Sequence, residues 1–202
     1  MVEHTVSATP IVCLASMSPR RRELLLQIGV SHKVLAAHID ESILPDELPH
    51  AFVARLARIK ALTVRERGEI LPVLAADTTV VLDGAVYGKP VDRADALAML
   101  GALSGRTHDV LTAVALATAR GVTLRVSRNS VGFRNIGRAE MEAYWATGEP
   151  RDKAGGYAIQ GYGAVFVATL SGSYSGVMGL PLLETAELLR AAGIRCWSGA
   201  AP

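Results

Sequence analysis

The chain has 202 residues, of which 50% are hydrophobic and 20% charged, and its formal net charge is +2 at pH 7. A chain of this length and hydrophobicity can bury a continuous core, which excludes an intrinsically disordered protein. The small net charge argues against a protein that coats nucleic acid non-specifically. The sequence shows neither a run of the roughly 18 to 20 apolar residues that a membrane span needs nor a signal peptide. We expect one domain, residues 1–202, that acts in the cytoplasm.

Strand and helix periodicities alternate from the start of the chain. The stretch "PIVCLA" (10–15) predicts a first strand. Ser18 is a suitable N-cap and Pro19 a suitable first helical residue, so a helix is expected to begin there. "HKVLAA" (32–37) predicts a second strand. Residues 50–67 predict an amphipathic helix whose apolar face carries Phe52, Leu56, Ile59 and Leu62.

Longer strands are expected in the rest of the chain. "PVLAADTTVVLDGAVYG" (72–88) predicts a strand and a hairpin that turns at Asp83-Gly84. The later elements are a helix at 92 to about 100, strands at 107–117 and 122–136, a helix at 138–146, a Gly-rich segment, a strand at 164–170 and a helix at 182–192. Long strands with an antiparallel pattern among α/β elements favour a mixed sheet over a purely doubly wound one.

Three consecutive arginines fall in the first turn of the helix that begins at Pro19. Aligned peptide dipoles favour acidic side chains in that turn by roughly 0.3 to 1 kcal/mol each, so Arg20, Arg21 and Arg22 oppose the local field. An anion bound over the turn would reverse the sign, because backbone N–H groups and guanidinium groups both bind phosphate or carboxylate. A solvated basic patch is the alternative, and the stretch alone leaves both open.

Two carboxylates and two lysines are further candidates. Asp77 follows a short apolar run, where a side chain can emerge at a sheet edge into a crevice. A carboxylate there suits Mg²⁺ binding or proton transfer from water, with a turn-stabilising Asp as the alternative. Glu41, beside Asp40, is also interpretable as a loop charge, and Lys60 by itself as a surface lysine. Lys89, like Asp77, is open to both a functional and a structural interpretation.

The Gly-rich segment 152–163 does not match the dinucleotide-binding fingerprint, because its glycines have the wrong spacing. Glycines still let backbone approach a ligand closely, and Gln160 offers both a donor and an acceptor. His108 lies in a predicted strand without a nucleophile elbow or a Cys/His pair, so we expect a structural role for it.

Taken together, five blocks resemble the Maf family in order and spacing: "LASMSPRRRELL", "AADTTVVLDGAVYGKP", "SGRTHDVLTAVAL", "DKAGGYAIQGYGAVFV" and "GSYSGVMGLPL". Members of this family resemble inosine triphosphate pyrophosphatases in fold. The resemblance therefore implies an α/β fold with an elongated, twisted mixed sheet flanked by helices, with room for two lobes around a central cleft. It also implies a homodimer and hydrolysis of a nucleoside triphosphate to the monophosphate and pyrophosphate, with Mg²⁺ or Mn²⁺.

Residue by residue, the resemblance implies roles for most of the candidates. Triphosphate binding falls to Ser16, Arg20, Arg21, Lys60 and Lys89. Metal binding falls to Glu41 and Asp77, and Asp77 is also the implied proton acceptor. The cations and a divalent ion would balance the roughly four negative charges of a triphosphate, whereas Arg22 has no matching role.

Arg20, Thr78 and Gln160 match the branch of the family that prefers thymidine and uridine triphosphates. A sister branch that prefers 7-methylguanosine triphosphate tends to place Trp, Gln and Glu at these positions. Uracil and thymine present a ring N–H flanked by carbonyl oxygens, which a carboxamide meets with one acceptor and one donor. We expect pyrimidine triphosphates, including 5-substituted forms, as substrates, and no stable nucleic-acid or membrane binding. A 7-methylguanosine triphosphate pyrophosphatase, a terminal phosphohydrolase and a non-catalytic regulator of septum formation remain alternatives.

Overall fold

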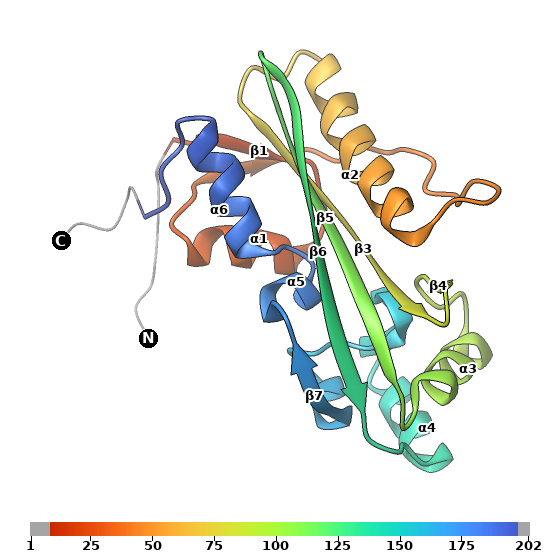
Figure 1. The fold of residues 1–202 in the computed structure, drawn as a ribbon. Helices are drawn as coiled ribbons and strands as arrows, with labels where there is room; N and C mark the ends of the chain where they lie inside the picture. Colours follow the sequence, from red (N-terminus) through yellow and green to blue (C-terminus); the bar gives the residue numbers. More distant parts are fainter. Residues whose placement is uncertain (1–8, 198–202) are drawn as a thin grey trace.

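The computed structural model describes residues 9–197, which form one seven-stranded sheet in the order β2-β1-β3-β5-β6-β7, with β4 paired to β3 (Figure 1). Strand β1 is parallel to β2 and β3, and the other neighbours are antiparallel. The strands are β1 (Val12–Leu14), β2 (His32–Val34), β3 (Val73–Leu82), β4 (Ala85–Tyr87), β5 (Thr107–Thr118), β6 (Gly121–Phe133) and β7 (Val167–Ser171). The predicted mixed, elongated and twisted sheet is confirmed.

Helices cover both faces of this sheet. They are α1 (Pro19–Gln27), α2 (Pro49–Glu66), α3 (Arg93–Leu103), α4 (Arg138–Ala146), α5 (Tyr174–Met178) and α6 (Leu182–Ala191), with 3₁₀ turns η1 (Glu149–Asp152), η2 (Ala154–Gly156) and η3 (Tyr162–Phe166). Helix α5 was not predicted, and β7 begins three residues later than expected because η3 occupies the preceding residues. None of these helices is both long and apolar enough to span a membrane.

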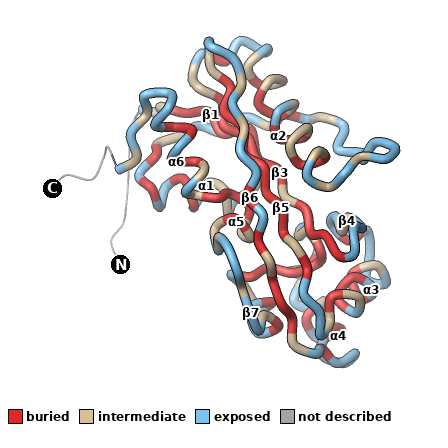
Figure 2. The backbone as a smooth tube through the Cα atoms, viewed as in Figure 1, coloured by how far each residue is buried: buried red, intermediate tan, exposed pale blue. Residues whose placement is uncertain are grey.

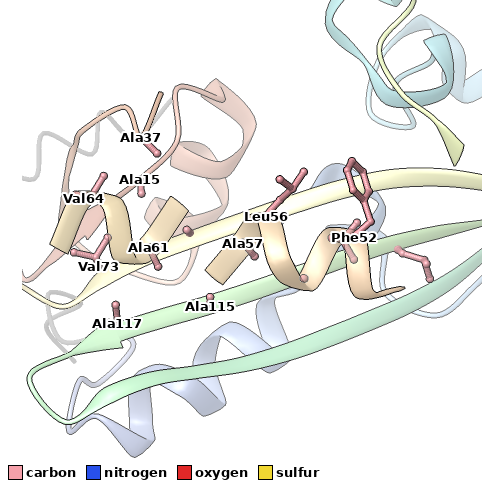
Figure 3. Packing of buried hydrophobic residues seen from close by; sticks show 14 of the residues in the cluster. Ala15, Ala37, Phe52, Leu56, Ala57, Ala61, Val64, Val73, Ala115 and Ala117 are labelled. Carbon is pink, nitrogen blue, oxygen red and sulfur yellow. The ribbon is translucent and has the colours of Figure 1, made fainter. Parts of the chain in front are cut away.

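Helix α2 packs on one face of β3 and β5 (Figure 3). The prediction for its buried face was wrong at Ile59 and Leu62, which are only partly buried. The buried face also carries Ala57 and Ala61, which lie over Ala115 and other small residues of the sheet, so the helix backbone approaches closely. This rotation of the buried stripe brings Lys60 inward.

The opposite face of the sheet is covered by two separate groups of elements (Figure 1). Helices α1 and α6 pack on one end of β3 and β5, around Leu74 and Leu116. Helices α3 and α4 and the Gly-rich segment pack on the other end, around Val80 and Val110. Strands β3 and β5 run through both groups and are buried along almost their whole length (Figure 2).

The middle of β3 has a strand neighbour on one side only. Strand β1 pairs with β3 at Val73 and Leu74, and β4 pairs with it only from Val80 onward. Asp77 was predicted to follow a strand, but it is the fifth residue of β3, and the opening beside it arises because β1 and β4 do not meet. Since side chains alternate along a strand, Asp77 faces α2 and Thr78 faces the opposite side.

Candidate functional site

A cavity of about 700 Å³ opens beside this unpartnered stretch of β3. All nine of the predicted site residues line it, including Glu41, Lys60 and Lys89, which were also open to a structural interpretation. Its charged lining consists of five cations and three carboxylates: Arg20, Arg21, Lys60, Lys89 and Lys153, with Glu41, Asp77 and Asp152. Cavities of roughly 300 to 1,000 Å³ suit small-molecule ligands, and the positive excess favours an anionic one.

Lys60 joins the two candidate carboxylates. Its Nζ donates to Asp77 Oδ1 and to Glu41 Oε1, at 2.7 Å in each case. Lys60 and Asp77 are 8% and 7% exposed, so the interpretation of Lys60 as a surface lysine was wrong. The Glu41 side chain is 51% exposed and lies toward solvent. A buried ammonium without such partners would be strongly destabilising, which explains why the lysine points to the carboxylates.

The surroundings of the two carboxylates shift their pKa values in opposite directions. Burial raises the pKa of Asp77, and the nearby charges of Lys60 and Arg21 only partly oppose it. Burial also acts to raise the pKa of Glu41, but the hydrogen bond from Lys60 and the charges of Lys60, Lys89 and Arg21 outweigh it and lower the pKa. Carboxylates whose pKa values are moved apart by their surroundings are suited to different roles in one site.

Arg21 is fixed by three protein acceptors on the other side of β3. Its Nε donates to the Gly179 carbonyl at 2.7 Å, Nη1 to Ser16 Oγ at 3.1 Å and Nη2 to Thr78 Oγ1 at 3.1 Å. Burial lowers the pKa of Arg21, and the charge of Asp77 opposes this. A guanidinium group carries five N–H donors, so this one retains donors for a ligand in the cavity.

The start of α1 offers further donors to an anion. Ser16 Oγ accepts from the backbone N–H of Ser18 at 3.2 Å as well as from Arg21, which leaves its own hydroxyl proton free. Ser18 occupies the predicted N-cap position but makes no side-chain cap hydrogen bond, so the first-turn N–H groups keep no side-chain acceptor. Arg20 lies 3.6 Å from Asp152 across the cavity, and Arg22 is exposed.

A buried threonine behind Arg21 was missed by the sequence analysis. Thr112 is fully buried and donates to the Gly176 carbonyl at 2.7 Å, with its Oγ1 3.0 Å from that of Thr78. It therefore connects β3, β5 and α5 beneath the cavity. A lone hydroxyl in the apolar stretch "VLTAVAL" was the available signal.

Lys89 and Gln160 lie at the more exposed rim of the cavity. The Gly88 carbonyl accepts from Gly155 N at 2.9 Å, which joins the loop of Lys89 to the Gly-rich segment. A Cβ on Gly155 would lie 2.8 Å from Val80 Cγ2, so this glycine accommodates the neighbouring strand rather than a ligand.

His108 lies outside the cavity lining and is 2% exposed. Its Nε2 is 2.8 Å from Tyr157 Oη, and its ring packs edge-on against Phe133 with centroids 4.9 Å apart. This burial and these contacts agree with the expected structural role of His108.

Comparison with known proteins matches residues 11–192 to the family described as Maf-like protein. The chain belongs to this family. The dTTP/UTP pyrophosphatase of Alkalilimnicola ehrlichii is 56% identical over 89% of this chain and 92% of its own length. The dTTP/UTP pyrophosphatase of Burkholderia pseudomallei is 51% identical over 96% of this chain and 99% of its own. Among solved structures, the Ham1 protein of Staphylococcus aureus matches 60% of this chain and 71% of its own, with 13% identity and a TM-score of 0.37.

The donor set of the site fits a divalent ion of the kind the Maf family implies. Within residues 9–197 no group of three or more His, Cys, Asp and Glu side chains is placed to hold a metal ion. Asp77 and Glu41 nevertheless meet at one atom, Lys60 Nζ. Mg²⁺ is usually held by one or two carboxylates together with water and substrate phosphates. Two carboxylates in a cation-rich cavity therefore suit an ion that binds with a nucleotide.

Proposed function

We propose that the protein hydrolyses thymidine and uridine triphosphates, including 5-substituted forms, to the monophosphate and pyrophosphate with Mg²⁺ or Mn²⁺. The observation that carries the proposal is the contact of Lys60 with both Asp77 and Glu41 in a cavity that also holds Arg21 and Lys89. This places carboxylates suited to activating water beside cations suited to phosphates. The names of the relatives at 51% and 56% identity support the same reaction.

In the proposed reaction, a water attacks the α-phosphorus in line with the bond to the bridging oxygen. Asp77 takes the proton from the water, and the pyrophosphate leaves with the electron pair of the broken bond. Arg20, Arg21 and Lys89 hold the phosphates and stabilise the charge that develops on the leaving group, and Lys60 and the Ser16 hydroxyl add donors. Asp77 and Glu41 would hold the divalent ion, which would polarise phosphoryl oxygens as a Lewis acid.

The base would lie toward the Gly-rich rim, where Gln160 lines the cavity. Its carboxamide can accept from the ring N–H of uracil or thymine and donate to a flanking carbonyl. Arg20, another of the three positions that separate the two branches of the family, lines the same cavity. The Thr78 hydroxyl holds Arg21, so Thr78 acts on the substrate at least through that guanidinium.

The biological role that we propose is removal of non-standard nucleotides from the cytoplasmic pool by a homodimer. The family resemblance supports this assembly. Sedimentation of the purified protein tests it: a dimer at micromolar concentration is expected, and a monomer under those conditions contradicts it.

The reaction is tested by incubating the purified protein with Mg²⁺ or Mn²⁺ and a panel of normal and modified triphosphates. Pyrophosphate and orthophosphate are measured separately, and release of pyrophosphate with the monophosphate is expected. Orthophosphate alone would indicate a terminal phosphohydrolase, and tight binding without turnover would indicate a non-catalytic regulator. Preference for 7-methylguanosine triphosphate would assign the protein to the sister branch.

A further inference from the structure

A hydrogen-bonded pair of side chains lies behind the Gln160 loop and outside the cavity lining. Tyr144, in α4, donates from its hydroxyl to Glu149 Oε1 at 2.7 Å. The same hydroxyl accepts from the backbone N–H of Ala158 at 3.1 Å. Glu149 accepts from two more backbone groups, Tyr162 N at 2.9 Å through Oε2 and Gly163 N at 3.0 Å through Oε1. The pair therefore holds the chain on both sides of Gln160.

The side chain of Gln160 has no comparable support. It is exposed, and among the described residues its carboxamide has no hydrogen-bond partner. Its placement therefore depends on the backbone of residues 158–163. That backbone turns tightly, since Gly161 N donates to the Ala158 carbonyl at 3.3 Å and Ala164 N to the Gly161 carbonyl at 3.1 Å.

Gly161 and Gly163 allow the loop backbone to approach Tyr144 and Glu149 closely. A Cβ on Gly161 would collide with the Glu149 carboxylate. A Cβ on Gly163 would lie 2.7 Å from Tyr144 Oη and 2.9 Å from the Ala158 carbonyl oxygen. The backbone is thus wrapped directly around the two side chains, with no room for a side chain at Gly161 or Gly163.

The pair is itself held firmly. Tyr144 is 4% exposed, and its ring packs edge-on against Phe166 with centroids 5.0 Å apart. Burial acts to raise the pKa of Glu149, but hydrogen bonds from Tyr144 and from the Gly163 and Tyr162 N–H groups lower it overall. Glu149 is therefore ionised at neutral pH, and a carboxylate is an acceptor on both oxygens.

We propose that Tyr144 and Glu149 are positioning residues for base selection, which set the place of Gln160 by fixing Ala158 on one side of it and Tyr162 and Gly163 on the other. The proposal rests on the proposed function, in which Gln160 reads uracil or thymine. A misplacement of about 1 Å, even from a substitution far from the reacting atoms, can cost on the order of 100-fold in rate. The phosphate-binding residues come from other elements, so loosening the pair impairs base selection more than phosphate binding.

The test uses Tyr144→Phe and Glu149→Gln in the full chain, with kcat/KM measured for uridine and guanosine triphosphates. In Glu149→Gln, one side-chain oxygen becomes an NH₂ group that faces a backbone N–H. We expect the uridine-to-guanosine ratio of kcat/KM to fall by about tenfold in each variant, within the range that misplacement produces. The matched control is Glu142→Gln on α4, whose exposed side chain pairs with Arg138 and Arg93, and it keeps the wild-type ratio.

A second readout separates positioning from general stability. Amide hydrogen exchange at Tyr162 and Gly163 is expected to accelerate in Glu149→Gln while the exchange of core strand β5 stays unchanged. The proposal is overturned if the uridine-to-guanosine ratio of kcat/KM does not change, as when both nucleotides lose activity equally. It is also overturned if exchange at these two amides does not change. Should Glu149→Gln not fold, Tyr144→Phe, which keeps the ring packing on Phe166, decides by the same ratio.

The wild-type measurement keeps the two proposals distinct. If wild-type protein releases no pyrophosphate from any nucleotide, the proposed function fails, and the same ratio is then read from the Kd values of uridine and guanosine triphosphates. A Kd ratio that falls in the variants supports the positioning role, and a Kd ratio that does not change overturns it.

Discussion

Lys60 Nζ donates to Asp77 and to Glu41 at the same distance, 2.7 Å, although the three residues come from α2, β3 and the loop that precedes α2. One ammonium group therefore contacts two carboxylates, one buried and one exposed. The three groups meet only when α2 packs on the sheet, so the site depends on the same contacts that form the core.

Asp77→Asn is expected to keep the fold and to lower kcat by roughly 100- to 1,000-fold. Asparagine preserves the size of the side chain and an acceptor for Lys60, but it removes the negative charge that takes a proton and binds a metal ion. Pyrophosphate release measures the loss of activity, and a thermal melt measures the stability of the fold.

The matched control is Asp83→Asn. Asp83 is an exposed residue in the hairpin turn with a φ of 51°, a backbone conformation that asparagine tolerates. Near-normal turnover of Asp77→Asn would move the catalytic role, most directly to Glu41.

The three arginines of α1 are expected to respond differently to substitution. Arg21→Lys should lose hydrogen bonds to Ser16, Thr78 or Gly179, because an ammonium group cannot reproduce the geometry of a guanidinium group. We expect this substitution to destabilise the fold by about 1 to 3 kcal/mol and to lower activity. Arg20→Ala should raise KM without a comparable loss of stability. Arg22→Ala, at an exposed position, should change stability by less than about 0.5 kcal/mol.

Urea unfolding and steady-state kinetics on the same preparations give both quantities. If Arg22→Ala proves as harmful as Arg21→Lys, the anion site is not arranged as the hydrogen bonds of Arg21 indicate. If Arg20→Ala leaves KM unchanged, the residue is not needed to bind the nucleotide.

Most of the sheet was predictable from the sequence because its signals are local. The Asp83-Gly84 turn is one case: both residues have positive φ, at 51° and 81°, and the hairpin pairs Leu82 with Ala85 as expected. An apolar run likewise predicted β3, and alternating residues predicted β5 and β6. Helix α5 has only five residues, which is too short for a periodic pattern to show.

The site was only partly predictable from local patterns. Lys60 was interpretable as a surface lysine because its burial depends on small residues of the distant sheet, such as Ala115. Only the resemblance to the Maf family joined it to Asp77. Tyr144 and Glu149 were not singled out, since Glu149 is bonded to backbone N–H groups 13 and 14 residues later and no side-chain motif marks them.

That residues 1–202 form one domain stays a prediction, and we expect one cooperative unfolding transition. Strands β3 and β5 carry side chains of the core around α2 and of both groups on the opposite face. Loss of either half of the sheet would expose the same strands, so the halves should not unfold separately. Calorimetric and van't Hoff enthalpies that agree would support this, and two resolved transitions would contradict it.

His108 is expected to make stability fall with decreasing pH. Burial lowers the pKa of His108 from 6.5 to about 4, with the charge of Asp109 opposing this. Between these two values the unfolded chain binds a proton that the folded chain does not, so stability falls as pH drops from about 6.5 to about 4 and levels off below it. At about 1.4 kcal/mol per pKa unit, the loss is roughly 3 kcal/mol.

Urea unfolding from pH 4 to pH 7 measures this loss, with His108→Gln as the comparison because glutamine can still bond to the Tyr157 hydroxyl. The difference in stability between the two proteins should change between about pH 4 and pH 6.5 and be nearly constant from there to pH 7. A difference that does not change with pH would assign the acid sensitivity to other groups.

Base selection should move toward the methylated purine when Gln160→Glu is combined with Arg20→Trp. Uracil and thymine offer a carbonyl on each side of the ring N–H, so a glutamate, which only accepts, would face an oxygen lone pair. A 7-methylguanine presents two adjacent donors and a positive ring, which suit a carboxylate and an aromatic face. The double variant should therefore lose far more kcat/KM for thymidine and uridine triphosphates than for 7-methylguanosine triphosphate. Because Arg20 also binds phosphate in the proposed site and faces Asp152 at 3.6 Å, Arg20→Ala alone serves as the control for lost phosphate binding. It removes the guanidinium without adding an aromatic face, so it should lower kcat/KM for all of these nucleotides alike. Equal losses in the double variant would show that Gln160 does not read the base.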